Sequence, residues 1–243
     1  MCFSGKVSYI AGGILLSLGL CCISICCFAS GHHGVKQRLS YFPLAIVPLL
    51  FGMQQITEGF VWSDLQNETA IGIYMYMAYA FWCFWIPFAF MIAEIGYFRI
   101  NSRSPTTRRK ARFRMVVLMI NTLIGFAFMI YMTTSILKKP LQATIRGGHI
   151  LYNGNPRATY AVAPDTWSIG NGFGVSLYVY LIISSMCVTS MKGGRLLGIV
   201  SAITLTITLV VYHITWTSTW CFFQAIVSVI IVWMIWSSVT RAN

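Results

Sequence analysis

Seven long apolar runs constrain the fold of this chain more than any other feature. Each has roughly the 20 residues that a helix needs to cross the hydrocarbon core of a bilayer. Unpaired backbone groups are costly in lipid, so such runs form helices. We predict an all-α fold, a seven-helix bundle that makes residues 1–243 one multi-pass integral membrane domain. The helices are expected at about residues 8–29, 40–62, 71–95, 113–137, 169–190, 196–215 and 219–239.

The composition supports a membrane location. Apolar residues make up 57% of the chain and charged residues only 9%, whereas soluble domains carry about 25% charged residues. The net charge of +12 would suit nucleic acid only if the basic residues shared a soluble face, but they gather in short loops beside apolar runs. We therefore expect the lipid bilayer, and no nucleic acid, as partner. The composition fits a plasma membrane and an internal membrane equally.

The distribution of lysine and arginine predicts the orientation, because these residues favour the cytoplasmic side. Seven spans place the two ends of the chain on opposite sides. Of the 17 basic residues, 5 fall on the amino-terminal side and 12 on the other. The amino terminus should lie outside and the carboxyl terminus inside. The outer residues are Lys6, Lys138, Lys139, Arg146 and Arg157; the inner ones are Lys36, Arg38, Arg99, Arg103, Arg108, Arg109, Lys110, Arg112, Arg114, Lys192, Arg195 and Arg241.

The densest basic block, residues 99–114, is predicted to be a turn-rich inner loop, because it contains the sequence Ser-Arg-Ser-Pro-Thr-Thr. Its first interpretation is an orientation anchor. Binding of anionic lipid headgroups is the alternative, since clustered juxtamembrane basic residues are attracted to them.

The longest outer loop, between the fourth and fifth helices, predicts a small extracellular β-hairpin over the bundle. Two short runs, 149–152 and 157–162, flank Asn153-Gly154-Asn155-Pro156. Asn-Gly between alternating apolar residues is the strongest short-range hairpin signal.

The second apolar run contains polar residues where they are costly. With 100° per residue and Gln54 at zero, Glu58 lies near about 40°, Trp62 near about 80° and Gln55 near about 100°, all in one sector. Glu58 should lie about 6 Å, and Gln54 about 12 Å, below the outer boundary. This sector should face the bundle interior or a water-filled pocket, because lipid offers such groups no partners. The residues then serve as a ligand site or as hydrogen bonds between helices.

Helix six should bring a histidine to the same depth. His213 is 17 positions past Leu196, about 26 Å along a helix, and Tyr212 precedes it in a stripe of hydroxyl residues. The candidate ligand-binding residues are therefore Gln54, Gln55, Glu58, Trp62, Tyr212 and His213. A hydrogen-bonding histidine at the membrane boundary is the alternative for His213.

Cys2 is a further candidate. A small residue at position two usually permits removal of Met1, which leaves an amine and a thiol on one residue. Cys2, Glu58 and His213 therefore form a candidate metal site, with a metal ion as the implied cofactor. A disulfide with Cys221 and a buried thiol are the alternatives for Cys2. A retinal Schiff base is not expected, because residues 219–239 contain no lysine.

Two motifs resemble a family of uncharacterised multi-pass membrane proteins. They are the start Met1-Cys2-Phe3-Ser4 with Ser8, and Pro48-Leu49-Leu50-Phe51 followed by Gln54-Gln55, Glu58-Gly59 and Trp62. The resemblance covers about the first quarter of the chain. It implies that Cys2, Ser4, Gln55, Glu58 and Trp62 belong to the family pattern, and it implies no activity.

Three functional hypotheses follow. The first is an outward-facing polar pocket that binds or transports a small solute, an ion or a proton, as in a transporter or receptor. The second is a metal- or thiol-dependent membrane enzyme that acts on a lipid or small molecule. In the third, the polar residues only join helices.

Overall fold

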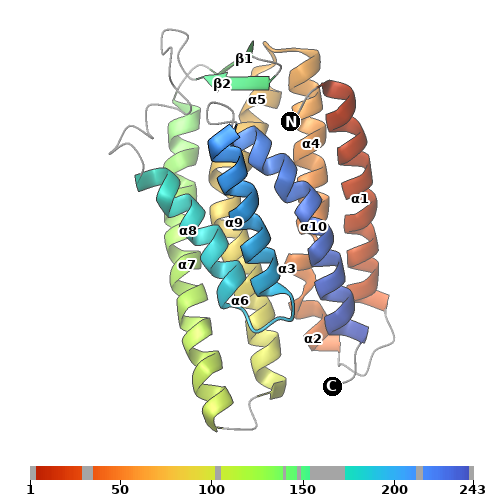
Figure 1. Cartoon of the computed structure of the whole chain (residues 1–243), viewed down its shortest axis with the longest axis vertical. Coiled ribbons are helices and arrows are strands. Elements are labelled where there is room, and N and C mark those ends of the chain that lie inside the picture. The colour runs from red at the N-terminus through yellow and green to blue at the C-terminus, as the bar shows by residue number, and fades with distance from the viewer. Residues whose placement is uncertain are drawn as a thin grey trace.

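The computed structural model describes residues 4–28, 35–101, 105–138, 141–146, 149–153, 173–211 and 216–240. Long helices run side by side along one axis, and a two-stranded hairpin lies at one end of the bundle (Figure 1). In chain order the elements are α1 (Gly5–Phe28), α2 (Val35–Ser40), α3 (Phe42–Ala45), α4 (Val47–Ser63), α5 (Glu68–Met75), η1 (Tyr76–Phe81), α6 (Trp82–Asn101), α7 (Pro105–Leu137), β1 (Gln142–Arg146), β2 (His149–Asn153), α8 (Phe173–Val188), α9 (Gly194–Val211) and α10 (Trp216–Thr240).

Within the described residues, six helical segments are long and apolar enough to cross a membrane. The prediction of a helical integral membrane protein is therefore confirmed. The fifth predicted span coincides with α8, whose segment Gly174–Val188 is apolar but shorter than the other six. The count of seven spans, and the orientation derived from it, stay predictions. The six long segments are Gly5–Phe28, Phe42–Ser63, Glu68–Phe98, Arg108–Leu137, Gly194–Val211 and Thr219–Val239.

Glycines allow α1 and α4 to pack backbone against backbone. A Cβ placed on Gly19 of α1 would lie 2.5 Å from the backbone nitrogen of Leu49. On the other helix, a Cβ on Gly52 would lie 2.9 Å from the nitrogen of Leu16. These distances leave no room for a side chain, and small residues permit such approach between membrane helices. The close packing fixes the depth of α4 relative to α1.

The segment from α5 to α6 is one long helix with an irregular middle. Residues Tyr76–Phe81 form the π-helical segment η1, and such insertions often occur at functional sites. The hydroxyl of Tyr178 on α8 donates to the Ala78 carbonyl at 2.8 Å, so the wider turns also bond outside their own helix. Trp82 follows η1 directly, and its side chain points toward α4, as described below.

The basic block is largely helical, which corrects the predicted loop at 99–114. α6 extends to Asn101 and α7 begins at Pro105, so only residues 102–104 lie between them. The Ser-Pro-Thr-Thr sequence indicated a turn, but proline is also common in the first turn of a helix, where its missing N–H costs nothing. α7 therefore starts well before residue 113 and carries much of the basic block on its own surface.

The predicted hairpin is present, but with a different partner strand. β2 pairs antiparallel with β1, with Arg146 opposite His149 and Gln142 opposite Asn153. The sequence between the paired Arg146 and His149 is Gly-Gly, which is as strong a hairpin signal as Asn-Gly. Asn153 is instead the last residue of β2, and the expected strand at 157–162 lies outside the described residues.

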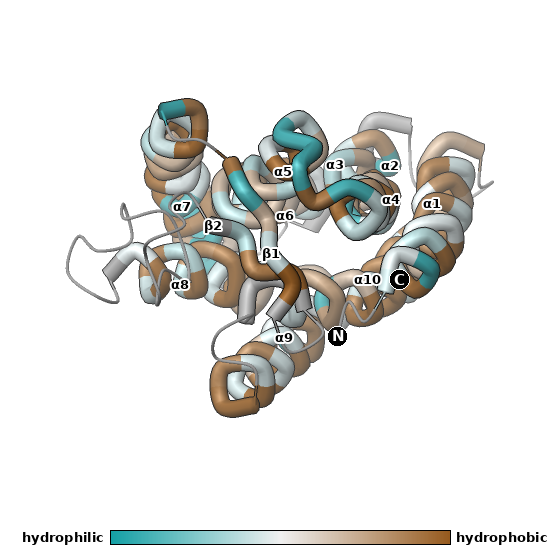
Figure 2. The backbone as a smooth tube through the Cα atoms, turned by 90° about the horizontal axis from the view of Figure 1, so that it is seen from above, coloured by the Kyte–Doolittle hydropathy of each residue, from teal (hydrophilic) through white to brown (hydrophobic). Residues whose placement is uncertain are grey.

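The hairpin covers the end of the bundle that the sequence assigned to the outside. The rings of Tyr152 on β2 and Tyr74 on α5 stack with centroids 4.5 Å apart. Ile150 and Tyr152 belong to a buried cluster with Ile136 of α7 and Cys221 of α10. Seen from above, the strands cross the middle of the bundle, while α1 and α9 lie at its periphery (Figure 2). The hairpin therefore packs over the site described next.

Candidate functional site

The polar side chains of α4 are shut inside the bundle. Gln54, Gln55 and Glu58 each have an exposed fraction of 0%, whereas Met53 and Phe60 on the same helix are 49% and 53% exposed. Gln55 and Glu58 also interact with neighbouring groups. The burial expected from the polar sector is thus observed, because α4 turns its apolar residues toward the lipid. A ligand-binding role for these residues stays a prediction.

Trp82 holds one end of Gln54. Its indole nitrogen Nε1 donates to Gln54 Oε1 at 2.7 Å, and its ring stacks on Phe51 with centroids 4.0 Å apart and planes 19° apart. An indole N–H can only donate, so the amide oxygen faces the tryptophan and the amide nitrogen points elsewhere. The contact joins α6 to α4 and orients the amide.

α1 contributes a hydroxyl at the depth of Glu58. α1 and α4 run antiparallel: a Cβ on Gly5 would meet the Cβ of Trp62 at 3.2 Å, and a Cβ on Gly12 would lie 3.0 Å from the Gly52 carbonyl oxygen. Ser8 lies midway between Gly5 and Gly12 along α1 and is fully buried. It is therefore level with the turn of α4 that carries Glu58.

α10 brings a thiol and a second hydroxyl to the same region. Cys221 is buried, and its thiol lies within hydrogen-bonding reach of the Gln54 side chain and within electrostatic range of Glu58. Thr219 is fully buried two residues earlier on the same helix, about 3 Å along its axis. Side chains from α4, α6 and α10 therefore meet at Gln54 and Cys221 beside Glu58, while Ser8 of α1 and Thr219 of α10 are buried at neighbouring depths. We call Ser8, Gln54, Gln55, Glu58, Trp82, Thr219 and Cys221 the Glu58 centre.

Several polar atoms of this centre lack hydrogen-bond partners. Among the described residues, the buried atoms Ser8 Oγ, Gln54 Nε2 and Thr219 Oγ1 have none, nor does the indole nitrogen of Trp62, which is half-buried at the end of α4. Buried polar groups in folded proteins are nearly always bonded, and each exception needs an explanation, such as water or an ion. The Glu58 centre thus has unused hydrogen-bonding capacity.

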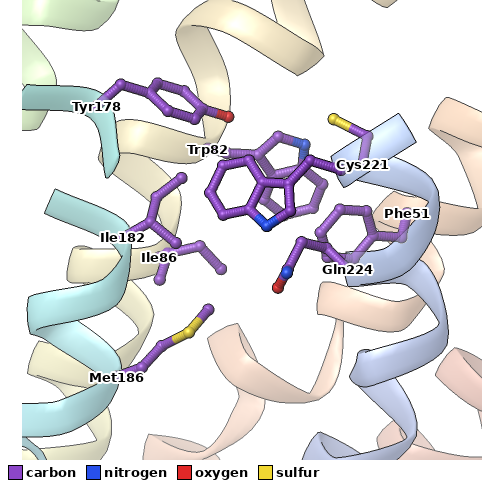
Figure 3. A pocket seen from close by; sticks show the side chains of 9 residues that line it. Phe51, Trp82, Ile86, Tyr178, Ile182, Met186, Cys221 and Gln224 are labelled. Carbon is purple, nitrogen blue, oxygen red and sulfur yellow. The ribbon is translucent and has the colours of Figure 1, made fainter. Parts of the chain in front are cut away.

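A small cavity adjoins the centre on its inward side. Its volume is about 20 Å³, enough for about one water molecule. Figure 3 shows the labelled side chains of Phe51, Trp82, Cys221 and Gln224 converging on it from one side and those of Tyr178, Ile182 and Met186 from the other. The complete lining is Phe51, Trp82, Ile86, Tyr178, Ile182, Met186, Trp220, Cys221 and Gln224.

Beyond the cavity, a chain of hydrogen bonds leads to α9. Ser201 Oγ donates to Gln224 Oε1 at 2.9 Å, and Gln224 Nε2 donates to Thr204 Oγ1 at 3.1 Å. The indole nitrogen of Trp220 donates to the Ser201 carbonyl oxygen at 3.3 Å. The hydroxyl stripe of the sixth predicted helix therefore bonds across to α10.

Three predicted site residues lie outside the described residues: Cys2, Tyr212 and His213. Their convergence on Glu58, the metal site of Cys2, Glu58 and His213, and a disulfide between Cys2 and Cys221 all stay predictions. Among the residues that the structure describes, no group of three or more histidine, cysteine, aspartate or glutamate side chains is placed to hold a metal ion.

Sequence reasoning missed four members of the arrangement. Trp82 lies in the aromatic run Phe81-Trp82-Cys83-Phe84-Trp85, and no local signal shows that its indole reaches Gln54. Thr219 and Gln224 lie in the last apolar run, where Gln224 could have been found as an isolated amide in a span. Ser8 belongs to the motif that marked the family resemblance, but it was not placed in the site.

A second buried carboxyl lies toward the opposite end of the bundle. Glu94 of α6 has an exposed fraction of 0%. It accepts hydrogen bonds from the Ser190 backbone nitrogen at 2.8 Å, the Ser190 hydroxyl at 2.5 Å and the Thr189 hydroxyl at 3.3 Å. Arg114 of α7 in turn donates to Ser190 Oγ. The Glu94 carboxyl is thus bonded to the α8–α9 connection, with Arg114 of the basic block one hydrogen bond further on.

Comparison with known families gives one match. The model of a family of unknown function, DUF6629, matches residues 1–243. The chain belongs to this family. The match covers the whole length of the chain, and it brings no activity with it. No curated protein matches the chain. No solved structure matches it either.

Proposed function

We propose that this protein binds a proton or a small ion at the Glu58 centre and passes it into the bundle. The observation that carries the proposal is the combination of a fully buried carboxyl with unpartnered polar atoms on three neighbouring helices. Intramembrane carboxyls that face a bundle interior commonly mark ion pathways and proton relays. The membrane location rests on the six long apolar helices, and family membership is neutral on the activity.

The size of the adjoining cavity favours the smallest of the predicted ligands. Pockets for organic solutes usually have volumes of about 300–1,000 Å³, whereas this cavity measures about 20 Å³. A site with so little free space suits a proton or a small ion better than a sugar or an amino acid.

Proton movement is the direct test. The purified protein, reconstituted into liposomes that contain a pH-sensitive dye, should dissipate an imposed pH gradient faster than empty liposomes do. Glu58→Gln keeps the size of the side chain but cannot exchange a carboxyl proton, so it should reduce the rate to that of empty liposomes. Glu68→Gln removes a carboxyl from an exposed position and should leave the rate unchanged.

Binding without transport is tested separately. A proton site at Glu58 predicts a carboxyl infrared band that changes with pH and is missing from Glu58→Gln. If Glu58→Gln alters neither this band nor the proton flux and only lowers thermal stability, the polar residues join helices and the proposal is wrong. Bound metal that disappears in Cys2→Ala and His213→Ala would instead support the enzyme hypothesis.

A further inference from the structure

We infer that the inner end of α7 is a binding site for an anionic phospholipid, with a phosphate-bearing headgroup on its basic groove and an acyl chain along the adjoining apolar stripe. This site is independent of the proton function proposed above, since it lies at the opposite end of the bundle. The site lies on one face of α7, where a groove lined by three cationic side chains adjoins an apolar stripe.

The groove has the size and charge for a phosphate-bearing group. It encloses about 500 Å³, within the usual range for ligand sites, about 300–1,000 Å³. Its lining residues recur at helical spacing and therefore share one face of α7: Thr106, Arg109, Lys110, Phe113 and Arg114. The segment 99–114 contains seven basic residues and no acidic one, so no carboxylate of this segment competes for the cations.

Arg114 is held in place for this role. Its guanidinium donates to Ser190 Oγ, and that hydroxyl donates to the buried carboxyl of Glu94 at 2.5 Å. A guanidinium carries five N–H donors in a rigid fork, so further donors are left for a second acceptor. Arg109 and Lys110 are exposed beside it. The groove therefore combines one anchored cation with two exposed ones, and phosphate oxygens match this donor arrangement.

The apolar stripe identifies the ligand as a lipid. Phe113 lines the groove and is 68% exposed, and the exposed residues continue toward the middle of α7 with Val116, Ile120 and Leu123. Their spacing of three, four and three residues keeps them on the side that also carries Arg109. A soluble phosphate uses only the groove. A phospholipid covers both surfaces, with its phosphate on the cations and its chain on the stripe.

The test measures thermal unfolding of the purified full-length protein in detergent while short-chain phosphatidylglycerol is added. Arg109→Gln/Lys110→Gln is compared with Lys192→Gln/Arg195→Gln, which removes two charges from exposed positions in the α8–α9 connection and the start of α9. Phosphatidylglycerol should raise the melting temperature of the wild type and of the control pair. In the groove pair the apparent Kd should weaken by about tenfold to thirtyfold.

Two further arms separate the possible sources of phosphate. Phosphatidylcholine, which has no net charge, should stabilise the wild type less than phosphatidylglycerol does. Phe113→Ala should weaken phosphatidylglycerol binding, while Leu196→Ala, which truncates a residue 49% exposed on α9, should not. Equal stabilisation by inorganic phosphate, with no effect of Phe113→Ala, would overturn the lipid assignment in favour of a free phosphate.

Equal losses in the two charge pairs would also overturn the inference, because attraction would then depend on overall charge and not on the groove. Should the groove pair fail to fold, the single variants Arg109→Gln and Lys110→Gln replace it. Each is expected to weaken phosphatidylglycerol binding by about fivefold. Wild-type affinity in both singles would equally contradict the site.

Discussion

Glu58 and Glu94 are equally buried, yet their surroundings differ. Glu94 is surrounded by donors: a backbone N–H and two hydroxyls bond its carboxylate, and Arg114 bonds one of those hydroxyls. The Glu58 centre, in contrast, contains Ser8 Oγ, Gln54 Nε2 and Thr219 Oγ1, which have no partner among the described residues.

This difference is the basis for proposing a structural role for Glu94 and a ligand-binding role for the Glu58 centre. A buried polar network in which every group is hydrogen-bonded stiffens the structure around it. Buried polar groups without hydrogen-bond partners are costly, and they persist where another species, such as water or an ion, is bound. The Glu94 network joins α6, α7 and the α8–α9 connection. The Glu58 centre is the better candidate for a ligand site, although both carboxyls lie in a membrane-embedded bundle.

The largest expected effect is that of Glu94→Ala. It removes the acceptor of three hydrogen bonds at once and leaves the donors buried, so the free energy of unfolding should fall by about 3 kcal/mol. Equilibrium unfolding in mixed micelles measures this change. Glu94→Gln retains a carbonyl oxygen and should lose less. A Glu94→Ala variant as stable as the wild type would show that the hydrogen bonds to Glu94 do not stabilise the fold.

Trp82→Phe should have the next largest effect. The change keeps an aromatic ring against Phe51 but removes the N–H that Gln54 Oε1 accepts, which should cost about 1–2 kcal/mol of unfolding free energy. Trp85→Phe is the matched control, because its indole donates to the Pro43 carbonyl oxygen at a longer 3.2 Å and the residue is only half-buried. If thermal denaturation shows equal losses of stability in Trp82→Phe and Trp85→Phe, the hydrogen bond from Trp82 to Gln54 has no special importance for stability.

A pair of serine variants compares the two regions directly. Ser190→Ala removes a hydroxyl that donates to Glu94, and its cost should be about 1 kcal/mol, within the range of interhelical hydrogen bonds in membrane proteins. Ser8→Ala removes a hydroxyl without a described partner, and the unfolding free energy should stay within about 0.5 kcal/mol of wild type. A larger loss of unfolding free energy in Ser8→Ala than in Ser190→Ala would contradict this difference between the two regions.

The smallest stability effect is expected for Thr219→Val, which exchanges an unpartnered hydroxyl for a methyl group of similar size. Its melting temperature should match that of the wild type, because no observed hydrogen bond is lost. In the liposome assay, however, the same variant should slow proton movement if the unpartnered atoms serve the ligand. Unchanged flux would remove Thr219 from the Glu58 centre without affecting the role of Glu58.

The sequence by itself determined where helices form and which face of α4 turns inward. Apolar runs of bilayer length must satisfy their own backbone hydrogen bonds, and three polar residues in one helical sector must avoid lipid. Both properties are local, so they can be read from spacing. The burial of Gln54, Gln55 and Glu58 follows from that spacing.

Only the tertiary structure decided which groups meet those side chains. Trp82 reaches Gln54 across 28 positions of sequence, and its direction depends on the π-helical turns before it, which no residue pattern announces. The choice of β1 as the partner of β2 depended on two competing turn signals of similar strength. Contacts between distant elements arise from packing, where one close approach such as Gly19 against Leu49 sets the depth of every residue along α1 and α4.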